Sequence, residues 1–198
     1  MKLIKISAVA AAVALATSAA AADLSKVPSG KYDVDTTHAY IHMKYNHLGL
    51  SNPILGFEKF ATSVNLDAEN PANSTVALEI DVDSVRTGSD IFHDHLTSEK
   101  WFDVANNPTA TFNSTAVAAN GDGTFDVTGD LTIKGTTKPV TMQVTVNNAM
   151  QHPMKKQPVI GISAHGGLKR SDWGLGANVP FISDEVKLEV QAELLMGQ

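Results

Sequence analysis

Histidine is the residue type in this chain best suited to chemistry, and five histidines fall into two groups. His38, His42 and His47 lie in one stretch, and His93 and His95 lie in another. Imidazole nitrogens are common metal ligands, so a metal-dependent hydrolase that uses His93 and His95 is one hypothesis. The chain has no cysteine and no His-Glu-x-x-His motif, and no nucleophile and base stand together as a motif.

The spacing of His38 and His42 argues against a shared metal site. Residues four apart meet on a helix, but polar and apolar residues alternate over residues 39–45, as in a strand. On a strand the two side chains would share a face about 13 Å apart. We therefore expect surface or mouth histidines, and we predict no catalytic set, no metal site and no cofactor.

The clearest structural element is a predicted hairpin over residues 123–146. Apolar and polar residues alternate in two runs, which the segment 134–139 separates. This period of two is typical of antiparallel strands with one apolar face. An isolated hairpin is marginally stable in water, so other parts of the chain must cover that face. The apolar face is expected to carry Phe125, Val127, Leu131 and Ile133, and then Val140, Met142, Val144 and Val146.

Similar alternating runs predict about eight strands in all. One run loses its alternation at residues 57–60, which predicts a bulge beside Gly56. The polar, proline-flanked segment 147–158 predicts a loop. Residues 89–102 have the spacing of one short amphipathic helix or of two turns, and Ser89 can act as a helix N-cap. The strands are expected at 32–35 with 39–45, 54–67, 75–83, 109–117, the two hairpin runs, 159–169 and 185–195.

This pattern favours an all-β fold, an eight-stranded antiparallel barrel with one short helix. There are too few helices to cover an open sheet, and each strand has one polar face that suits water outside. Eight closed strands leave an interior wide enough for side chains or for one small ligand. A two-sheet sandwich with a solid core fits the same strand count, so both architectures stay open.

The inward positions of the predicted strands are nearly all aliphatic. Such a lining cannot partner the polar groups of a polar ligand, but it can hold a long apolar chain. Each buried five-carbon isoprenoid unit would contribute roughly 3–4 kcal/mol at ~0.8 kcal/mol per methylene. Association costs about 4–15 kcal/mol, so a few units would suffice for tight binding. A filled core is the alternative interpretation of the same residues. The candidate ligand-binding residues are Ile41, Met43, Tyr45, Phe57, Phe60, Leu78, Ile80, Phe92, Leu96, Trp101, Phe102, Phe112, Leu131, Ile133, Met142, Val144 and Trp173.

The first 22 residues have the pattern of a secretory signal peptide. Lys2 and Lys5 precede an apolar run over residues 3–17, and small residues follow up to Ala22. The run is shorter than the ~20 residues that a membrane span needs. We therefore expect cleavage after Ala22, a single domain over residues 23–198, and a location in a periplasm-like space.

Charge and composition limit the partners. The net charge is −6 and no basic cluster occurs, which argues against nucleic acid and anionic membrane surfaces as partners. No second apolar run approaches membrane-spanning length, so we expect no stable membrane span. A homodimer is compatible with the sequence, although nothing in the sequence requires one.

An ordered set of short segments runs across the whole mature chain: residues 32–35 with His38, 56–57 with Phe60, 94–98 with 101–103, 108–112, 129–140 and 169–174. This set resembles the YceI-like family of bacterial secreted proteins. The resemblance implies a lipocalin-like antiparallel barrel whose tunnel holds a long amphiphile, such as a polyisoprenoid, an isoprenoid quinone or a fatty-acid amide. It also implies a binding protein in transport, storage or stress protection, with no catalytic residues to carry over.

Overall fold

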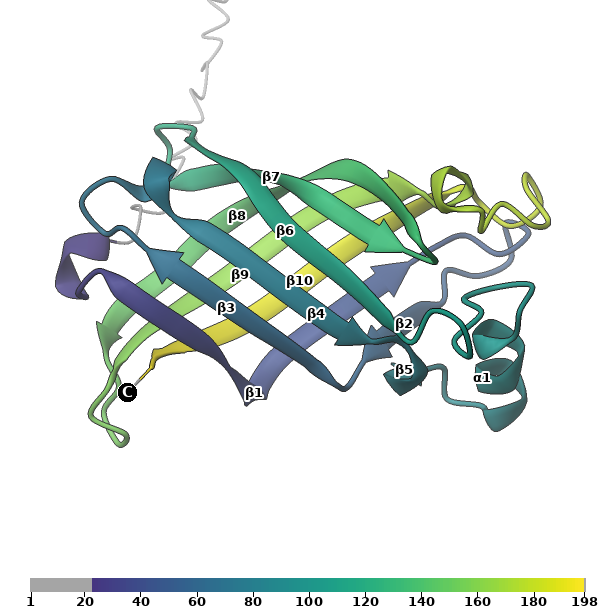
Figure 1. The fold of residues 1–198 in the computed structure, drawn as a ribbon, viewed down its shortest axis with the longest axis horizontal. Coiled ribbons are helices and arrows are strands. Elements are labelled where there is room, and N and C mark those ends of the chain that lie inside the picture. Colours follow the sequence, from purple (N-terminus) through teal and green to yellow (C-terminus); the bar gives the residue numbers. More distant parts are fainter. Residues whose placement is uncertain (1–22, 198) are drawn as a thin grey trace, which may run out of the picture.

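The computed structural model describes residues 23–197, so the predicted signal peptide at residues 1–22 lies outside the described residues. These residues form ten strands, four short 3-10 helices and one α-helix (Figure 1). The strands are β1 (Gly30–Lys44), β2 (Ile54–Phe57), β3 (Phe60–Leu66), β4 (Thr75–Asp81), β5 (Val85–Arg86), β6 (Thr109–Ala119), β7 (Thr124–Ile133), β8 (Thr136–Gln151), β9 (Pro158–Lys169) and β10 (Glu185–Met196).

Eight of the strands close into an antiparallel barrel. The order is β1, β3, β4, β6, β7, β8, β9 and β10, and β10 pairs back onto β1. The closing register runs from Tyr32 opposite Met196 to Lys44 opposite Lys187. Closure leaves no open edge along these strands, which is how all-β proteins avoid exposed backbone donors and acceptors. The predicted eight-stranded antiparallel barrel with one short helix is confirmed.

The two remaining strands extend one end of the barrel. The first residues of β1 pair with β3, whereas residues 41–44 of β1 pair with β2, and β2 pairs with β5. Only Glu58 and Lys59 separate β2 from β3. The predicted irregularity at residues 57–60 is therefore present, and it divides the expected strand 54–67 into two pieces.

The prediction of a loop over residues 147–158 is wrong for its first part, because β8 continues to Gln151. The register between β8 and β9 shifts after Val146, where Asn148 pairs with Gly161. A one-residue shift reverses the sides on which side chains point, so the alternation breaks while the strand continues. Beyond the shift, Ala149 is buried.

The predicted helix is α1 (Asp90–Thr97), and the Ser89 side chain caps it by accepting a hydrogen bond from the backbone N–H of Phe92 at 3.4 Å. Leu96 of α1 packs in one buried cluster with Trp101 and Leu55. No helix within residues 23–197 has the length and apolar character needed to cross a membrane. The 3-10 helices are η1 (Leu24–Lys26), η2 (Pro71–Asn73), η3 (Val82–Ser84) and η4 (Arg170–Trp173).

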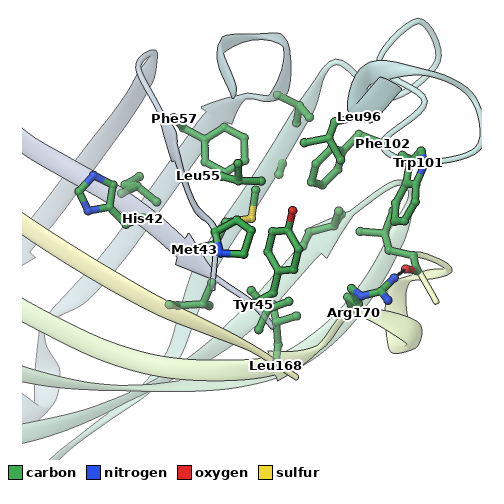
Figure 2. A pocket seen from close by; sticks show the side chains of 18 of the residues that line it. His42, Met43, Tyr45, Leu55, Phe57, Leu96, Trp101, Phe102, Leu168 and Arg170 are labelled. Atoms are coloured by element: carbon green, nitrogen blue, oxygen red, sulfur yellow. Dashed lines mark hydrogen bonds between the residues drawn. The ribbon is translucent and has the colours of Figure 1, made fainter. Parts of the chain in front are cut away.

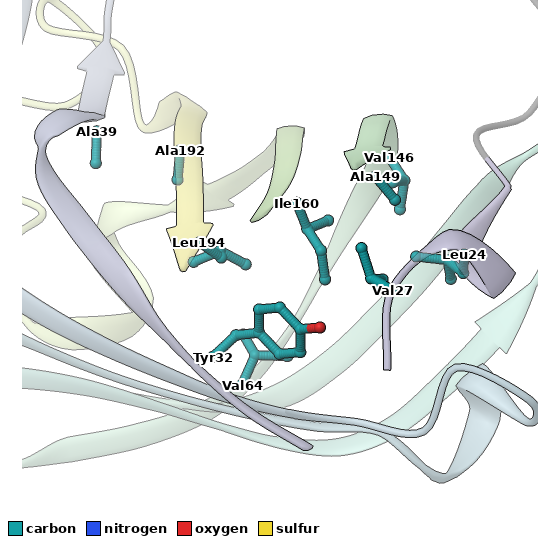
Figure 3. Packing of buried hydrophobic residues seen from close by; sticks show 10 residues of the cluster. All are labelled: Leu24, Val27, Tyr32, Ala39, Val64, Val146, Ala149, Ile160, Ala192 and Leu194. Atoms are coloured by element: carbon teal, nitrogen blue, oxygen red, sulfur yellow. The ribbon is translucent and has the colours of Figure 1, made fainter. Parts of the chain in front are cut away.

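A packed core fills the end of the barrel opposite α1. Leu24 of η1 and the following Val27 enter the barrel beside Tyr32, whose side chain is fully buried (Figure 3). The Tyr32 hydroxyl donates a hydrogen bond of 2.7 Å to the carbonyl of Pro28, which satisfies the one polar atom of that ring. The segment before β1 therefore acts as a plug for this end.

Candidate functional site

The other end of the barrel is hollow. A cavity of about 830 Å³ runs into the barrel from the end that carries α1 (Figure 2). This volume falls in the range of ~300–1,000 Å³ that is typical of ligand pockets. Most of the predicted ligand-binding residues line it, and they come from β1, β2, β4, β6, β7, β8, α1 and the segment after α1: Ile41, Met43, Tyr45, Phe57, Leu78, Ile80, Phe92, Leu96, Trp101, Phe102, Phe112, Leu131, Ile133 and Met142.

A smaller cavity of about 170 Å³ lies deeper in the barrel, and the predicted residues Phe60 and Val144 line it. The two cavities share five lining residues, which we call the waist: Ile41, Leu78, Phe112, Met142 and Val190. The cavities therefore follow one another along the barrel. A chain that filled the larger cavity would reach the smaller one through the waist.

Two glycines in the barrel wall leave space for waist side chains. A Cβ atom at Gly129 would lie 2.5 Å from the Phe112 ring, and one at Gly166 would overlap Sδ of Met142. A side chain at Gly129 would also clash with the backbone carbonyl of Asn113, whereas one at Gly166 would have to displace the flexible Met142 thioether, so these two waist residues lie against bare backbone. This arrangement keeps Phe112 and Met142 close to the wall.

The predicted residue Trp173 lies apart from both cavities. Its side chain is buried in a cluster with Leu131 and Val140, and its indole N–H donates to the carbonyl of Leu131 at 3.1 Å. The ring therefore anchors η4 and the segment that follows it to the barrel. In the sequence, Trp173 is an aromatic residue beside glycines. That pattern does not show whether the ring packs against the barrel or lines the cavity.

Several lining residues were missing from the predicted set. The predicted set contains no residue of segments 159–169 and 185–195. The alternation of both segments is the signal that could have identified their inward-facing side chains. The missed residues from these strands are Leu168, Val186, Leu188 and Val190, and further ones elsewhere are Leu55, Val82 and Leu175.

Polar groups gather at the open end of the cavity. Among residues 23–197, no aspartate or glutamate lines the cavity, and Arg170 is its one Lys or Arg side chain. The remaining polar side chains are histidines, hydroxyls and an amide, including His47, Ser51 and Asn178. A cationic head group would find no counter-charge in this lining.

Tyr45 brings a hydroxyl into the apolar part of the cavity. In Figure 2 the hydroxyl points toward Leu55, Phe57 and Phe102, and it forms no hydrogen bond with the other side chains drawn there. Burial raises the pKa of the Tyr45 phenol, and Arg170 partly offsets this rise. The phenol thus stays protonated at neutral pH and can donate one hydrogen bond.

Arg170 forms the polar floor of the open end, and it supports the loop after η4. Its guanidinium donates to the carbonyls of Leu175, Ala177, Ile182 and Ser183. Burial lowers its pKa from the usual value, and the nearby Asp184 opposes this effect. The side chain is buried, so its charge acts through these four carbonyls and holds the mouth in one shape.

Trp101 connects Arg170 to α1. The Arg170 guanidinium carbon lies 5.7 Å from the centre of the Trp101 ring, and the His95 ring centre lies 5.4 Å away on another side. The Trp101 Nε1 is buried and has no hydrogen-bond partner within residues 23–197. A buried donor without a partner is uncommon, but this atom is not exposed to the cavity, so the indole N–H does not face a bound molecule.

The histidines do not form a metal centre of the kind expected for a hydrolase. His93 and His95 lie two residues apart on α1, so their side chains diverge. His93 Nε2 lies 2.8 Å from the carbonyl of Asp83, whereas His95 stacks on Phe92 and packs on Trp101. The hydrolase hypothesis that uses His93 and His95 is therefore not supported.

A group with metal-ligating side chains occurs elsewhere, on the wall of the barrel. Ligand atoms of Asp35, His38 and Glu193 lie within 4.8 Å of one another. The Lys155 ammonium nitrogen lies 2.5 Å from Oδ2 of Asp35, and the Thr37 hydroxyl donates a hydrogen bond of 2.6 Å to Oδ1 of the same carboxylate. These contacts hold the pKa of Asp35 well below its usual range, with the Lys155 hydrogen bond as the largest cause. The contacts of Thr37 and Lys155 with Asp35, which we call the polar latch, lie where the register between β1 and β10 shifts between Val34 and Ala39, and they leave no open ligand site at Asp35.

The comparisons with known proteins agree with this geometry. A family model described as the YceI-like domain matches residues 32–194. A UPF0312 protein of Pseudomonas aeruginosa is 35% identical over 183 residues, which cover 92% of this chain and 95% of that protein. A UPF0312 protein of Yersinia pestis is 35% identical over 178 residues, covering 90% and 88%.

Solved structures match the whole barrel. BcnA of Burkholderia cenocepacia superposes with a TM-score of 0.72 at 27% identity, covering 81% of this chain and 98% of that one. A polyisoprenoid binding domain from Saccharophagus degradans gives 0.65 at 17% identity, covering 84% and 98%, and at this identity it shows the fold alone. Because the family model spans most of the sequence and the relatives match over nearly their full length, the chain belongs to the YceI-like family.

Proposed function

We propose that the protein binds one long apolar or amphiphilic chain in the hollow end of its barrel. The observation that carries this proposal is the cavity of about 830 Å³, whose lining within residues 23–197 contains no carboxylate. The family match and the neighbour described as a polyisoprenoid binding domain support a lipid of this kind. The candidate ligands are a polyisoprenoid, an isoprenoid quinone or a fatty-acid amide.

The energetics favour a chain several units long. One five-carbon unit contributes roughly 3–4 kcal/mol when its methylene-sized groups leave water. Association costs about 4–15 kcal/mol, so the first few units offset that cost and the next ones supply net affinity. The waist and the smaller cavity behind it add depth without adding polar groups. The depth of the two cavities therefore determines how long a bound lipid chain can be.

We assign the head group to the open end, beside Tyr45. The Tyr45 hydroxyl is a neutral donor in apolar surroundings. This donor favours an oxygen acceptor, such as a quinone carbonyl or an amide carbonyl. The lack of carboxylates in the lining, within the described part of the chain, disfavours an amine head group.

We propose a binding role rather than catalysis, in transport, storage or stress protection of the bound lipid. The position of the protein in the periplasm rests on the signal-peptide pattern of residues 1–22. A homodimer stays part of the proposal.

Identification of the bound molecule tests the function. The protein is purified without detergent from its own cells. Mass spectrometry then identifies the extracted lipid and measures its molar ratio to the protein. We expect close to one apolar chain per barrel in the natural protein. Ala110 is buried on the cavity wall, so Ala110→Phe should fill the cavity and lower the lipid content at least tenfold.

The matched control is Ala118→Phe, because Ala118 is exposed on the outside of β6. This variant should keep its full lipid content. Barrels that contain no lipid, or equal lipid in both variants, would contradict binding inside the cavity.

A further inference from the structure

Large apolar side chains are exposed around the open end of the barrel. Leu50 is 81% exposed, Phe181 is 71% exposed and Ile91 is 84% exposed. They come from the segment between β1 and β2, the segment between η4 and β10, and α1, which all lie at the same end (Figure 1). We call these and their neighbours the rim: Leu48, Leu50, Ile54, Ile91, Val179 and Phe181.

The rim belongs to the cavity entrance and is not a separate patch. The cavity lining includes Ser51 from the first segment, Asn178 and Ile182 from the second, and Ile91 from α1. Any chain that enters or leaves the cavity must therefore pass between the rim side chains. Exposed apolar patches of this kind mark sites of contact with proteins or membranes.

Hydrogen bonds hold the two rim segments together. The backbone N–H of Leu48 donates to the carbonyl of Phe181 at 2.9 Å, and that of Ser183 donates to the carbonyl of Asn46 at 2.9 Å. The Asn46 N–H also donates to Oγ of Ser183 at 2.9 Å. These contacts fix the segments side by side and keep Leu48 and Phe181 from folding back over the cavity.

The rim segments contain no formal charge. Asp, Glu, Lys and Arg make up 18% of the whole chain, yet none occurs in residues 45–57 or 173–183. The nearest charges on α1 are the exposed carboxylates Asp90 and Asp94. Uncharged apolar tips suit insertion among lipids, whereas carboxylates beside them disfavour an anionic lipid surface.

We propose that the rim inserts into the surface of a neutral lipid bilayer, so that the chain passes between membrane and cavity without entering water. This inference rests on the proposed function, because an apolar chain makes direct transfer necessary. A protein partner that covered all three rim elements would close the opening. A fluid bilayer presents lipid chains at the opening itself.

Flotation of the full barrel with phosphatidylcholine vesicles tests the proposal. We expect the natural protein to float with the vesicles, with binding that is insensitive to salt between low and physiological concentrations. The double variant Leu50→Ser with Phe181→Ser should lose at least tenfold in vesicle partitioning. Neither residue lines the cavity, so binding of a water-soluble fluorescent fatty acid should stay unchanged.

Met154→Ser is the matched control. Met154 is 83% exposed in the turn between β8 and β9, at the plugged end, and its loss should leave flotation unchanged. Flotation that the double variant does not weaken, or that Met154→Ser weakens equally, would overturn the proposal. A dimer of the natural protein in light scattering that is absent from the double variant would also overturn the proposal, because the rim would then be a contact between two copies of the chain.

The vesicle and fatty-acid measurements separate this inference from the proposed function. If the natural protein does not bind the fatty acid, the proposed binding function is refuted. If it binds the fatty acid but does not float with the vesicles, only the proposed membrane docking is refuted.

Discussion

The two ends of the barrel share the same strands but differ in what fills them. At the plugged end, Leu24 and Val27 enter from the segment before β1, and Tyr32 is fully buried between them and the wall. At the open end, no segment of residues 23–197 fills the barrel in the same way, and a cavity of about 830 Å³ remains. The alternation of the strands makes both ends apolar, and the segments outside the strands determine which end is solid.

Removing a large ring should affect the two ends very differently. Tyr32→Ala leaves a void in packed surroundings and should lower the free energy of unfolding by about 3–5 kcal/mol. Tyr45→Ala makes the same change beside the cavity, where the ring already borders open space, and should cost under about 1 kcal/mol. Urea denaturation of lipid-free protein measures both variants, and equal losses would show that the two ends are packed alike.

The Asp35 carboxylate of the polar latch should contribute more to stability than the Asp184 carboxylate near the open end. Asp35→Asn removes a buried carboxylate bound to Lys155 and Thr37, and should cost about 1.5–3 kcal/mol at pH 7. Asp184→Asn is the control. That carboxylate accepts hydrogen bonds only from Ser171 among residues 23–197, and its site is more exposed.

The effect of Asp35 should depend on pH. Its carboxyl pKa is depressed in the folded protein, so its stabilisation is complete above the unfolded pKa near ~3.9 and falls as the pH drops below it. The difference between the natural protein and Asp35→Asn should therefore shrink from about pH 4 toward pH 2. A difference that stays constant over this window would exclude the ionised latch as its source.

Added volume should be tolerated only at the open end. Ala149 is 1% exposed in the plugged core, so Ala149→Phe should cost about 1–3 kcal/mol through overpacking. Ala110→Phe extends into the cavity and should change stability by less than about 1 kcal/mol while it removes bound lipid. Thermal unfolding of both lipid-free variants measures the contrast.

The smallest effect should come from the waist. Gly166→Ala pushes the Met142 side chain toward the lumen, and the flexible thioether can move with little loss of stability. Binding of long prenols should weaken about tenfold, roughly 1.4 kcal/mol, relative to short ones that stop before the waist. Gly161→Ala, where the nearest atom to an added Cβ lies 3.9 Å away, is the control and should leave chain-length preference unchanged.

Much of the strand architecture and most of the lining could be predicted from the sequence. The alternation in β4, β7, β8 and β10 predicted which residues face inward, because the side-chain period of a strand is two. The prediction failed for residues 147–151, where a shifted register breaks that period while pairing continues. It also misplaced Trp173, because an aromatic residue in a loop has no period that shows where its ring points.

The role of Arg170 was equally hidden from the sequence. Arg170 lies two residues from Asp172 in the chain, but its guanidinium binds four carbonyls of residues 175–183. Backbone carbonyls carry no signature in a sequence. Contacts of this kind become visible only when the loop is folded over the side chain.

The sheet, its apolar inner face and the family could be predicted from local alternation and short motifs, which need no long-range information. The folded structure was needed to show that one end of the barrel is plugged by packed side chains and the other end is hollow. That difference depends on volumes contributed by segments far apart in the chain: Leu24 and Val27 enter one end, whereas the fixed rim segments leave the other end open.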